Sequence, residues 1–213
     1  MAASHVEDIP LKGPQLALAA VVLSLANFMV VLDTTITNVA LPTISGNLGV
    51  STTEGTWVIT AYAVAEAITV PLTDWLSRQF GRVRLFMMAL VAFVVFSVCC
   101  GLSRSLGSLV LFRVLQGIAG GPLIPLSSTL MLAVFPKSKS HIALALWGMM
   151  TVVAPIFGPI LGGLISDDWS WPWVFYINIG FGIFVWLGAR RVMGGHDKPV
   201  RRSRIDGVGL ALL

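Results

Sequence analysis

Long apolar runs separated by short polar segments dominate the pattern of this chain. The first run, from Leu16 to Leu32, contains only two polar residues, Ser24 and Asn27. About 20 apolar residues in an α-helix cross the hydrocarbon core of a bilayer. The pattern therefore predicts a bundle of spanning helices over residues 15–41, 56–76, 85–103, 108–135, 142–165 and 173–192. We expect an all-α membrane protein.

The composition supports this interpretation. Of the 213 residues, 56% are hydrophobic and only 11% are charged, and the mean hydropathy is +0.86. Soluble domains carry about 25% charged residues and must turn part of every residue class toward water. A soluble all-α domain with a large core is the alternative that this composition excludes.

The basic residues predict the orientation in the membrane. The net charge is +4. If the N-terminus lies in the cytoplasm, every Lys and Arg except Arg104 and Arg113 falls on the cytoplasmic side, as the positive-inside rule requires. Four tryptophans then gather at the outer interface, as in aromatic belts: Trp57, Trp169, Trp171 and Trp173. We expect a multi-pass protein of the inner (plasma) membrane that binds no nucleic acid.

The segments outside the spans predict the domain organisation. Residues 1–14 are expected to form a cytoplasmic tail, 15–193 the six-helix bundle, and 194–206 a basic cytoplasmic linker. Residues 207–213, "GVGLALL", form an apolar run too short to span a bilayer. We interpret them as the truncated start of a seventh helix, so that the chain corresponds to the N-terminal half of a larger transporter.

Three charged residues fall deep inside the predicted spans, away from their cytoplasmic ends: Asp33, Glu66 and Arg113. A charge at the bilayer centre costs about 2.5–3.5 kcal/mol on insertion scales, so such residues are functional candidates. Asp33 and Arg113 lie at similar depths below the outer surface and should pair if their helices meet. We hypothesise that a proton on Asp33 weakens this attraction and shifts the bundle between two openings. A static ion pair is the alternative.

Asp33 belongs to a polar face of the first span. At about 100° per residue, this face covers an arc of roughly 140°. Its members are Asn27, Asp33, Thr34, Thr37 and Asn38. We expect the face to line a cavity or the bundle interior. The alternative is that Asp33 lies in the outer headgroup region.

Glu66 belongs to a second polar stripe with Tyr62, Thr69 and Thr73. The spacing i, i+4, i+7, i+11 puts these residues on one helix face, which could line the same cavity. The alternative is a protonated Glu66 that is hydrogen-bonded between helices.

Small residues and prolines mark the segment 142–165. Ala154, Gly158, Gly162 and Ser166 recur every fourth residue, a stripe that allows another helix to approach closely. Pro155 and Pro159 remove backbone donors and should kink the helix. Generic close packing is the alternative to a functional stripe.

The basic segment "LTDWLSRQFGRVR" is expected to be a cytoplasmic loop that clamps helix ends by charge, or else a plain positive-inside loop.

Five motifs, in order, resemble a known family. These are "LDTTITNVALPTI", "LTDWLSRQFGRVRLF", "LFRVLQGIAGG", "APIFGPILGG" and "WSWPWVFYIN". Together they resemble the EmrB/QacA-type, fourteen-helix branch of drug:proton antiporters in the major facilitator superfamily. The resemblance covers nearly the whole chain. The chain departs from the family at Asp74, where the loop motif has its first glycine, at Arg78, Val83 and Ser170, and at Gly180, where a proline usually follows the asparagine, here Asn178.

The resemblance implies multidrug efflux: export of hydrophobic toxic compounds in exchange for protons, by alternating access. It also implies an EmrA-like periplasmic adaptor and an outer-membrane channel as partners, besides membrane lipids. Alternatives are a symporter of the same fold, which the motif "APIFGPILGG" argues against, and a truncated, non-transporting half. An intramembrane enzyme has little support, because His5, His141 and His196 all lie in predicted loops or tails. We expect no catalytic residue, metal or cofactor.

The candidate residues fall into four groups. For proton coupling they are Asp33, Arg113 and Glu66; for the substrate cavity Asn27, Thr34, Thr37, Asn38, Tyr62 and Gln116; for the antiporter motif Pro155, Gly158, Pro159, Gly162 and Gly163; and for a cytoplasmic loop gate Asp74, Arg78, Gly81 and Arg82.

Overall fold

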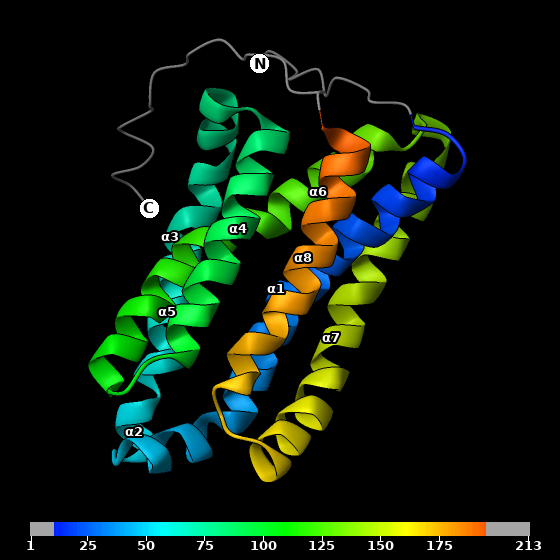
Figure 1. Ribbon diagram of the computed structural model, residues 1–213. Coiled ribbons are helices and arrows are strands. Elements are labelled where there is room, and N and C mark those ends of the chain that lie inside the picture. Colours follow the sequence, from blue (N-terminus) through cyan, green and yellow to red (C-terminus); the bar gives the residue numbers. More distant parts are fainter. Residues whose placement is uncertain (1–10, 195–213) are drawn as a thin grey trace.

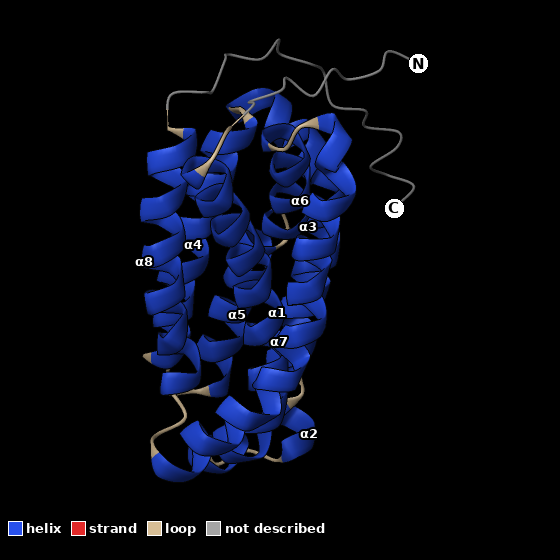
Figure 2. Ribbon diagram, turned by 90° about the vertical axis from the view of Figure 1, so that its right-hand side faces the viewer, coloured by secondary structure: helices blue, strands red, loops and turns tan. Residues whose placement is uncertain are grey.

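The computed structural model describes residues 11–194, and in this part of the chain the regular elements are all helical (Figures 1 and 2). They are α1 (Pro14–Leu48), α2 (Thr52–Gly55), α3 (Trp57–Phe80), α4 (Arg82–Gly101), α5 (Leu106–Gly120), α6 (Leu123–Val134), the 3-10 turn η1 (Lys137–Lys139), α7 (Ser140–Asp168) and α8 (Trp173–Met193). The tail 1–10 and residues 195–213, including the expected linker and seventh helix, lie outside the described residues.

Six helical stretches in the described part are long and apolar enough to cross a membrane. Two of them combine consecutive elements: Thr52–Phe80 contains α2 and α3, and Leu106–Val134 contains α5 and α6. The predicted all-α, six-span fold is therefore confirmed. The helices extend beyond the predicted apolar runs, because a helix ends where its backbone bonds end rather than where apolar residues stop. α1, for example, continues to Leu48 and ends at Gly49, whose left-handed φ of 67° suits glycine.

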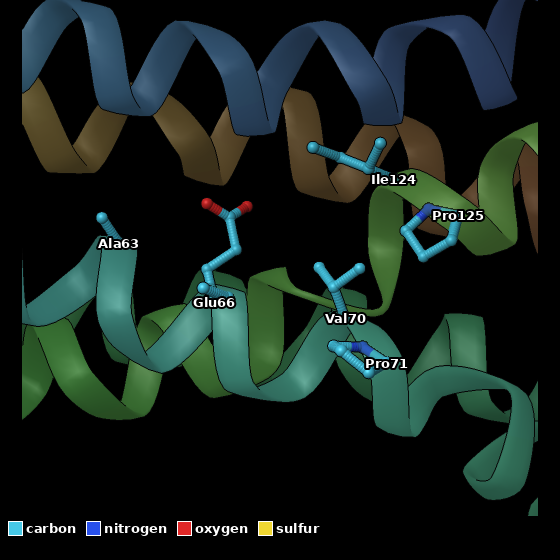
Figure 3. A pocket seen from close by; sticks show the side chains of 7 residues that line it. Ala63, Glu66, Val70, Pro71, Ile124 and Pro125 are labelled. Carbon is cyan, nitrogen blue, oxygen red and sulfur yellow. The ribbon is translucent and has the colours of Figure 1, made fainter. Parts of the chain in front are cut away.

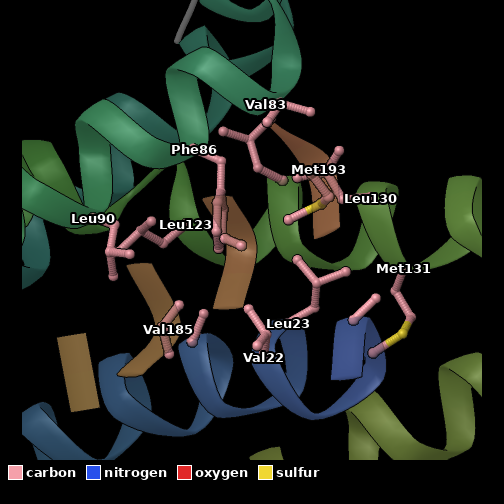
Figure 4. Close-up of a cluster of buried hydrophobic side chains, with 14 of the residues drawn as sticks. Val22, Leu23, Val83, Phe86, Leu90, Leu123, Leu130, Met131, Val185 and Met193 are labelled. Carbon is pink, nitrogen blue, oxygen red and sulfur yellow. The ribbon is translucent and has the colours of Figure 1, made fainter. Parts of the chain in front are cut away.

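The helices form two groups that pack against each other. α3, α4 and α5 lie together, and α1, α7 and α8 form the other group (Figure 1). Contacts of α4 with α8 and of α1 with α6 join the groups. The main apolar core lies at this junction and includes Val22, Leu23, Phe86, Leu90 and Leu123 (Figure 4). α1 is thus central, whereas most of α7 is exposed in the described structure.

The turn between α3 and α4 differs from the prediction. Asp74 and Arg78 lie in the last two turns of α3, and Arg82 is the first residue of α4, so only Gly81 separates the two helices. Gly81 has φ 86° and ψ 146°, a conformation that L side chains rarely adopt. Asp74 and Arg78 form an exposed i,i+4 ion pair of 2.5 Å within α3. The segment expected as a short loop is therefore helical except at Gly81, because polar residues can extend a helix into the interface without breaking it.

The small-residue stripe of α7 packs against α1. A Cβ on Gly158 would lie 2.6 Å from the Cβ of Thr35, and one on Gly162 would lie 3.0 Å from the Cβ of Val39. The expected close helix approach is confirmed, and its partner is α1. Pro155 and Pro159 are exposed, and α7 runs as one helix through both. Gly163 faces away from this contact, since an added Cβ there would meet no atom within 4 Å.

Aromatic residues and a capping box mark one end of the bundle. Trp169 and Trp173, at the end of α7 and the start of α8, pack edge to face with ring centroids 4.8 Å apart. At the same end, Ser51 and Glu54 form a capping box before α3. The Ser51 hydroxyl and backbone N–H both donate to the exposed Glu54 carboxylate.

Candidate functional site

A buried ion pair lies in the middle of the bundle. Arg113 Nη1 on α5 is 2.6 Å from Asp33 Oδ2 on α1, and neither residue is exposed to solvent. The pairing predicted from their similar depths is therefore present. Two opposite charges removed from solvent attract each other strongly, but each must also have its remaining hydrogen-bonding groups satisfied. The partners of both side chains decide how firmly the pair is held.

Two amides complete the shell of the Asp33 carboxylate. Gln116 Nε2 donates to Oδ1 over 3.0 Å, and Asn178 Nδ2 donates to the same oxygen over 2.6 Å. Asn178 also donates to Ser97 Oγ on α4 at 2.9 Å, and Ser97 in turn donates to the Phe175 carbonyl. The carboxylate thereby links α1 to α4, α5 and α8. Hydrogen bonds to a charged acceptor are stronger than neutral ones.

Arg113 is held from several sides. Its Nε donates to the Val58 carbonyl on α3 at 3.1 Å, and its Nη1 donates to Gln116 Oε1 at 2.9 Å. The guanidinium carbon lies 4.0 Å from the centroid of the Tyr62 ring, a cation–π contact. Because α1 and α3 both bind this one side chain, Arg113 couples the two helix groups.

The chemistry available to this site is the binding of one proton. A proton on Asp33 would remove the charge that Arg113 and the two amides stabilise. The carboxyl group has no exposed surface, so a proton reaches it only when neighbouring side chains move.

The other polar residues of α1 have different surroundings. Thr37 is buried and donates to the Asp33 backbone carbonyl, whereas Thr34 is partly exposed and Asn38 is exposed. Asn27 is buried and donates to the Trp147 carbonyl and to Thr151 Oγ1 on α7. The predicted face is thus divided between the bundle interior and an open side. Whether its members line a substrate cavity stays a prediction.

The polar stripe of α3 packs mainly against α5. Tyr62, Thr69 and Thr73 are buried. A Cβ on Gly117 would lie 2.5 Å from the Tyr62 carbonyl oxygen, and one on Gly121 would lie 2.9 Å from the Thr69 Cβ. Gly117 on α5 and Gly121 directly after it therefore let the two helices touch along this stripe. Gln116, expected in the cavity, lies instead within the Asp33 network.

Glu66 does not pair with Arg113 as Asp33 does. Among the ion pairs of residues 11–194, Asp33 is the carboxylate that pairs with Arg113, and Glu66 forms none. Glu66 lies in a groove between α3 and α6 (Figure 3). The structure thus brings together two of the three residues predicted for proton coupling.

Sequence reasoning missed Asn178 and Ser97 as parts of the site. A signal was present for Asn178, because it is an amide inside the apolar run 173–192, and polar groups inside a membrane seek partners on other helices. Ser97 gave a weaker signal, since a serine can satisfy itself on its own helix.

A model of the major facilitator superfamily matches residues 23–208. The chain belongs to this superfamily. It is 54% identical over 204 residues to "Multidrug export protein EmrB" of Escherichia coli, covering 96% of this chain and 40% of that protein. It is 52% identical over 205 residues to "Fatty acid resistance protein FarB" of Neisseria gonorrhoeae, with the same coverage. The EmrB/QacA-type resemblance is confirmed. The chain spans about 40% of the length of these relatives.

A solved peptide transporter has the same arrangement of helices. The crystal structure of the peptide transporter POT in complex with sulfate matches with a TM-score of 0.76 at 12% identity. The match covers 97% of this chain and 45% of that chain. At such low identity the likeness concerns the fold alone, and it agrees with the predicted six-helix bundle of a superfamily transporter.

Asn178 provides a test of the network. We expect Asn178→Leu to lower the free energy of unfolding by about 1–3 kcal/mol, because Asp33 Oδ1 loses its shorter hydrogen bond inside the bundle. Asn178→Asp should be worse, since it places a second carboxyl group beside Asp33. Thermal unfolding in detergent measures both. The control is Asn47→Ala, an exposed asparagine that bonds only the Thr43 carbonyl of its own helix. An equal effect of Asn178→Leu and Asn47→Ala would contradict the prediction.

Proposed function

We propose that the protein exports hydrophobic toxic compounds across the inner membrane in exchange for protons. The observation that carries this proposal is the buried Asp33–Arg113 pair, whose hydrogen-bond network joins α1, α3, α4, α5 and α8. A transporter driven by protons needs an ionisable group whose state changes helix packing, and intramembrane acids are the usual proton carriers. The names of the relatives as export and resistance proteins support the same function.

The proposed cycle follows from the contacts of Asp33. In the ionised state, Arg113, Gln116 and Asn178 hold the carboxylate. When a proton bonds to Oδ2, the charge-assisted bond from Arg113 Nη1 is lost. Arg113 keeps its bonds to Val58 and Gln116, and Oδ1 still accepts from Gln116 and Asn178, so that the hold of α5 on α1 is weakened. Release of the proton restores the pair, and alternation between the two states would expose the substrate site to opposite sides of the membrane.

We infer that the N-terminus lies in the cytoplasm. The start of α1, the α3–α4 turn, the α6–α7 turn and the end of α8 all lie at one end of the bundle (Figure 1). This end carries Arg82, Arg84, Lys137, Lys139, Arg190 and Arg191. Such an excess of basic residues supports the cytoplasmic assignment. The Trp169–Trp173 pair then lies at the periplasmic interface, where an EmrA-like adaptor leading to an outer-membrane channel is the proposed partner.

The proposal also includes roles for the glycines of α7 and for the residues around the α3–α4 turn. The glycine face of α7 on α1 supports an exporter, because Gly158 and Gly162 pack α7 directly beside the turn that carries Asp33. Asp74, Arg78, Gly81 and Arg82 are proposed to fix the cytoplasmic ends of α3 and α4 to each other during the cycle.

A drug-susceptibility assay tests the function. Cells that lack their own efflux pumps and express the full-length protein should tolerate higher concentrations of hydrophobic toxic compounds. Asp33→Asn should abolish this resistance, because it keeps the shape of the side chain and removes its titratable group. Glu54→Gln, which changes an exposed acid in the short helix α2, is the matched control. Full resistance with Asp33→Asn at equal membrane abundance would refute proton coupling through this site.

A further inference from the structure

A second buried polar cluster lies on α1, less than two turns before Asp33, where this helix contacts α7. It centres on Asn27, whose side chain is fully buried. Asn27 Nδ2 donates to Thr151 Oγ1 over 2.6 Å and to the Trp147 carbonyl over 3.2 Å. Both acceptors belong to α7, so one amide ties α1 to this helix.

Trp147 extends the cluster to a third helix. Its indole Nε1 donates to Ser127 Oγ on α6 over 2.9 Å, and the Ser127 hydroxyl donates to the Ile124 carbonyl over 2.8 Å. Ser127 is fully buried. Hydrogen bonds between helices inside a membrane help to hold the helices together. We call the bonded residues Asn27, Thr151, Trp147 and Ser127 the polar clasp.

α7 touches α1 in two different ways. Near Asp33, Gly158 packs against Thr35, whose hydroxyl donates to carbonyls of its own helix. Within residues 11–166, the side-chain hydrogen bonds that join α1 to α7 are those of Asn27. Packing against a glycine tolerates small shifts along the helix, whereas a hydrogen bond requires a defined distance and angle. The polar clasp therefore fixes the position of α7 along α1.

α6 is the second half of an interrupted membrane span. α5 ends at Gly120, and α6 begins at Leu123. Between them, Pro122 has no backbone N–H and leaves the Ile118 carbonyl without its usual helical donor. Sharp bends in helices occur at sites of this kind. The backbone can bend here more easily than inside a continuous helix.

The two halves of this span have different neighbours. α5 packs mainly on α3 and α4, whereas α6 packs mainly on α1. Leu123, Leu130 and Met131 of α6 lie in the main apolar core with Val22 and Leu23 of α1 (Figure 4). The polar clasp adds hydrogen bonds to this apolar contact. α6 is thus attached to α1 and α7, and α5 is attached to α3 and α4.

We propose that the polar clasp makes α6 and α7 move together with α1, and that the interrupted span bends at Gly121 and Pro122 when they do. The proposal rests on the proposed function for its driving step, in which a proton on Asp33 weakens the hold of α5 on α1. Movement of α1 then carries α7 through Asn27 and α6 through Trp147, while α5 remains with α3 and α4. Hinges absorb such movements in a few residues at the ends of helices.

A double-mutant cycle on the full-length protein in detergent tests the polar clasp. Trp147→Phe keeps an aromatic ring and removes the indole donor, and Ser127→Ala removes its acceptor. Each change should lower the unfolding temperature by about 1–3 °C. Their effects should not add, because either change breaks the same bond. The matched control is Trp75→Phe, since Trp75 is also partly buried and its Nε1 has no hydrogen-bond partner within the described residues. Its effect should add to that of Ser127→Ala.

Spin-label distances test the movement. Labels are attached to cysteines at the exposed positions Leu111 of α5, Leu132 of α6 and Met149 of α7, in full-length protein whose native cysteines are replaced by alanine. Asp33→Asn serves as a neutral stand-in for protonated Asp33. Relative to the wild type, it should shift the distance between positions 111 and 149 and leave the distance between positions 132 and 149 unchanged. Adding Trp147→Phe should shift or broaden the second distance as well.

The outcomes separate this inference from the proposed function. Additive losses of stability for Trp147→Phe and Ser127→Ala would overturn the polar clasp. A distance between positions 132 and 149 that shifts in Asp33→Asn with Trp147 intact, or that ignores Trp147→Phe, would overturn the joint movement. Drug resistance conferred by the wild type tests the proposed function independently. An export-active wild type in which Asp33→Asn shifts neither distance would keep that function and overturn the inference.

Discussion

Arg113→Ala is expected to destabilise the bundle by about 3–5 kcal/mol, because it leaves the Asp33 carboxylate buried without its cation. Gln116 and Asn178 would remain as neutral donors, which cannot replace a full charge. The variant should still bind substrate but couple its export poorly to protons. Thermal unfolding measures the first effect, and drug efflux from proteoliposomes with an imposed pH gradient measures the second.

The matching double variant separates charge burial from packing. Asp33→Asn combined with Arg113→Leu removes both charges, so it should be more stable than Arg113→Ala alone while remaining uncoupled. Arg104→Ala, at an exposed arginine outside the spans, is the control. Wild-type stability of Arg113→Ala, or a double variant no better than the single one, would show that the ion pair does not hold the helices. Normal proton-driven efflux by Arg113→Ala would refute its coupling role.

The sequence predicted the depth of each intramembrane residue but not its neighbours. Counting residues from the end of a span gives depth directly, since the rise per residue is constant. That argument placed Asp33 and Arg113 together correctly. It could not identify Asn178, because which helix faces which depends on the packing of the whole bundle. An amide on α8 reaches Asp33, and a serine on α4 reaches that amide, only after α1, α4 and α8 have assembled.

The helical spacing of polar residues predicts which residues share a helix face but not what that face contacts. The spacing on α3 places Tyr62, Glu66, Thr69 and Thr73 on one face, and it cannot distinguish a cavity from a helix contact. The glycines of α5 decide the matter, because they bring its backbone against Tyr62 and Thr69. Glu66 lies at the edge of this contact, where the α5–α6 break opens the groove. Small residues on the neighbouring helix therefore carry information that the polar stripe lacks.

Gly158 is expected to be the most sensitive glycine of α7. A Cβ added there would lie 2.6 Å from the Thr35 Cβ and 3.2 Å from the Thr35 carbonyl carbon. The second of these atoms belongs to the backbone, so α1 and α7 would have to separate. Overpacking of this kind costs about 1–3 kcal/mol. Because Thr35 is only two residues from Asp33, Gly158→Ala should also disturb the ion pair and reduce export.

Gly163→Ala is the matched control, because its added Cβ would meet no atom within 4 Å. It should unfold at the wild-type temperature or slightly above, since alanine favours the helix over glycine. A double-mutant cycle with Thr35→Gly then tests the contact itself. Removing the Thr35 side chain makes room for the new methyl group, so Gly158→Ala should cost less in that background than in the wild type. Equal costs in both backgrounds would mean that α7 does not rest on Thr35, and the position of Asp33 would have to be fixed by α5 and α8 alone.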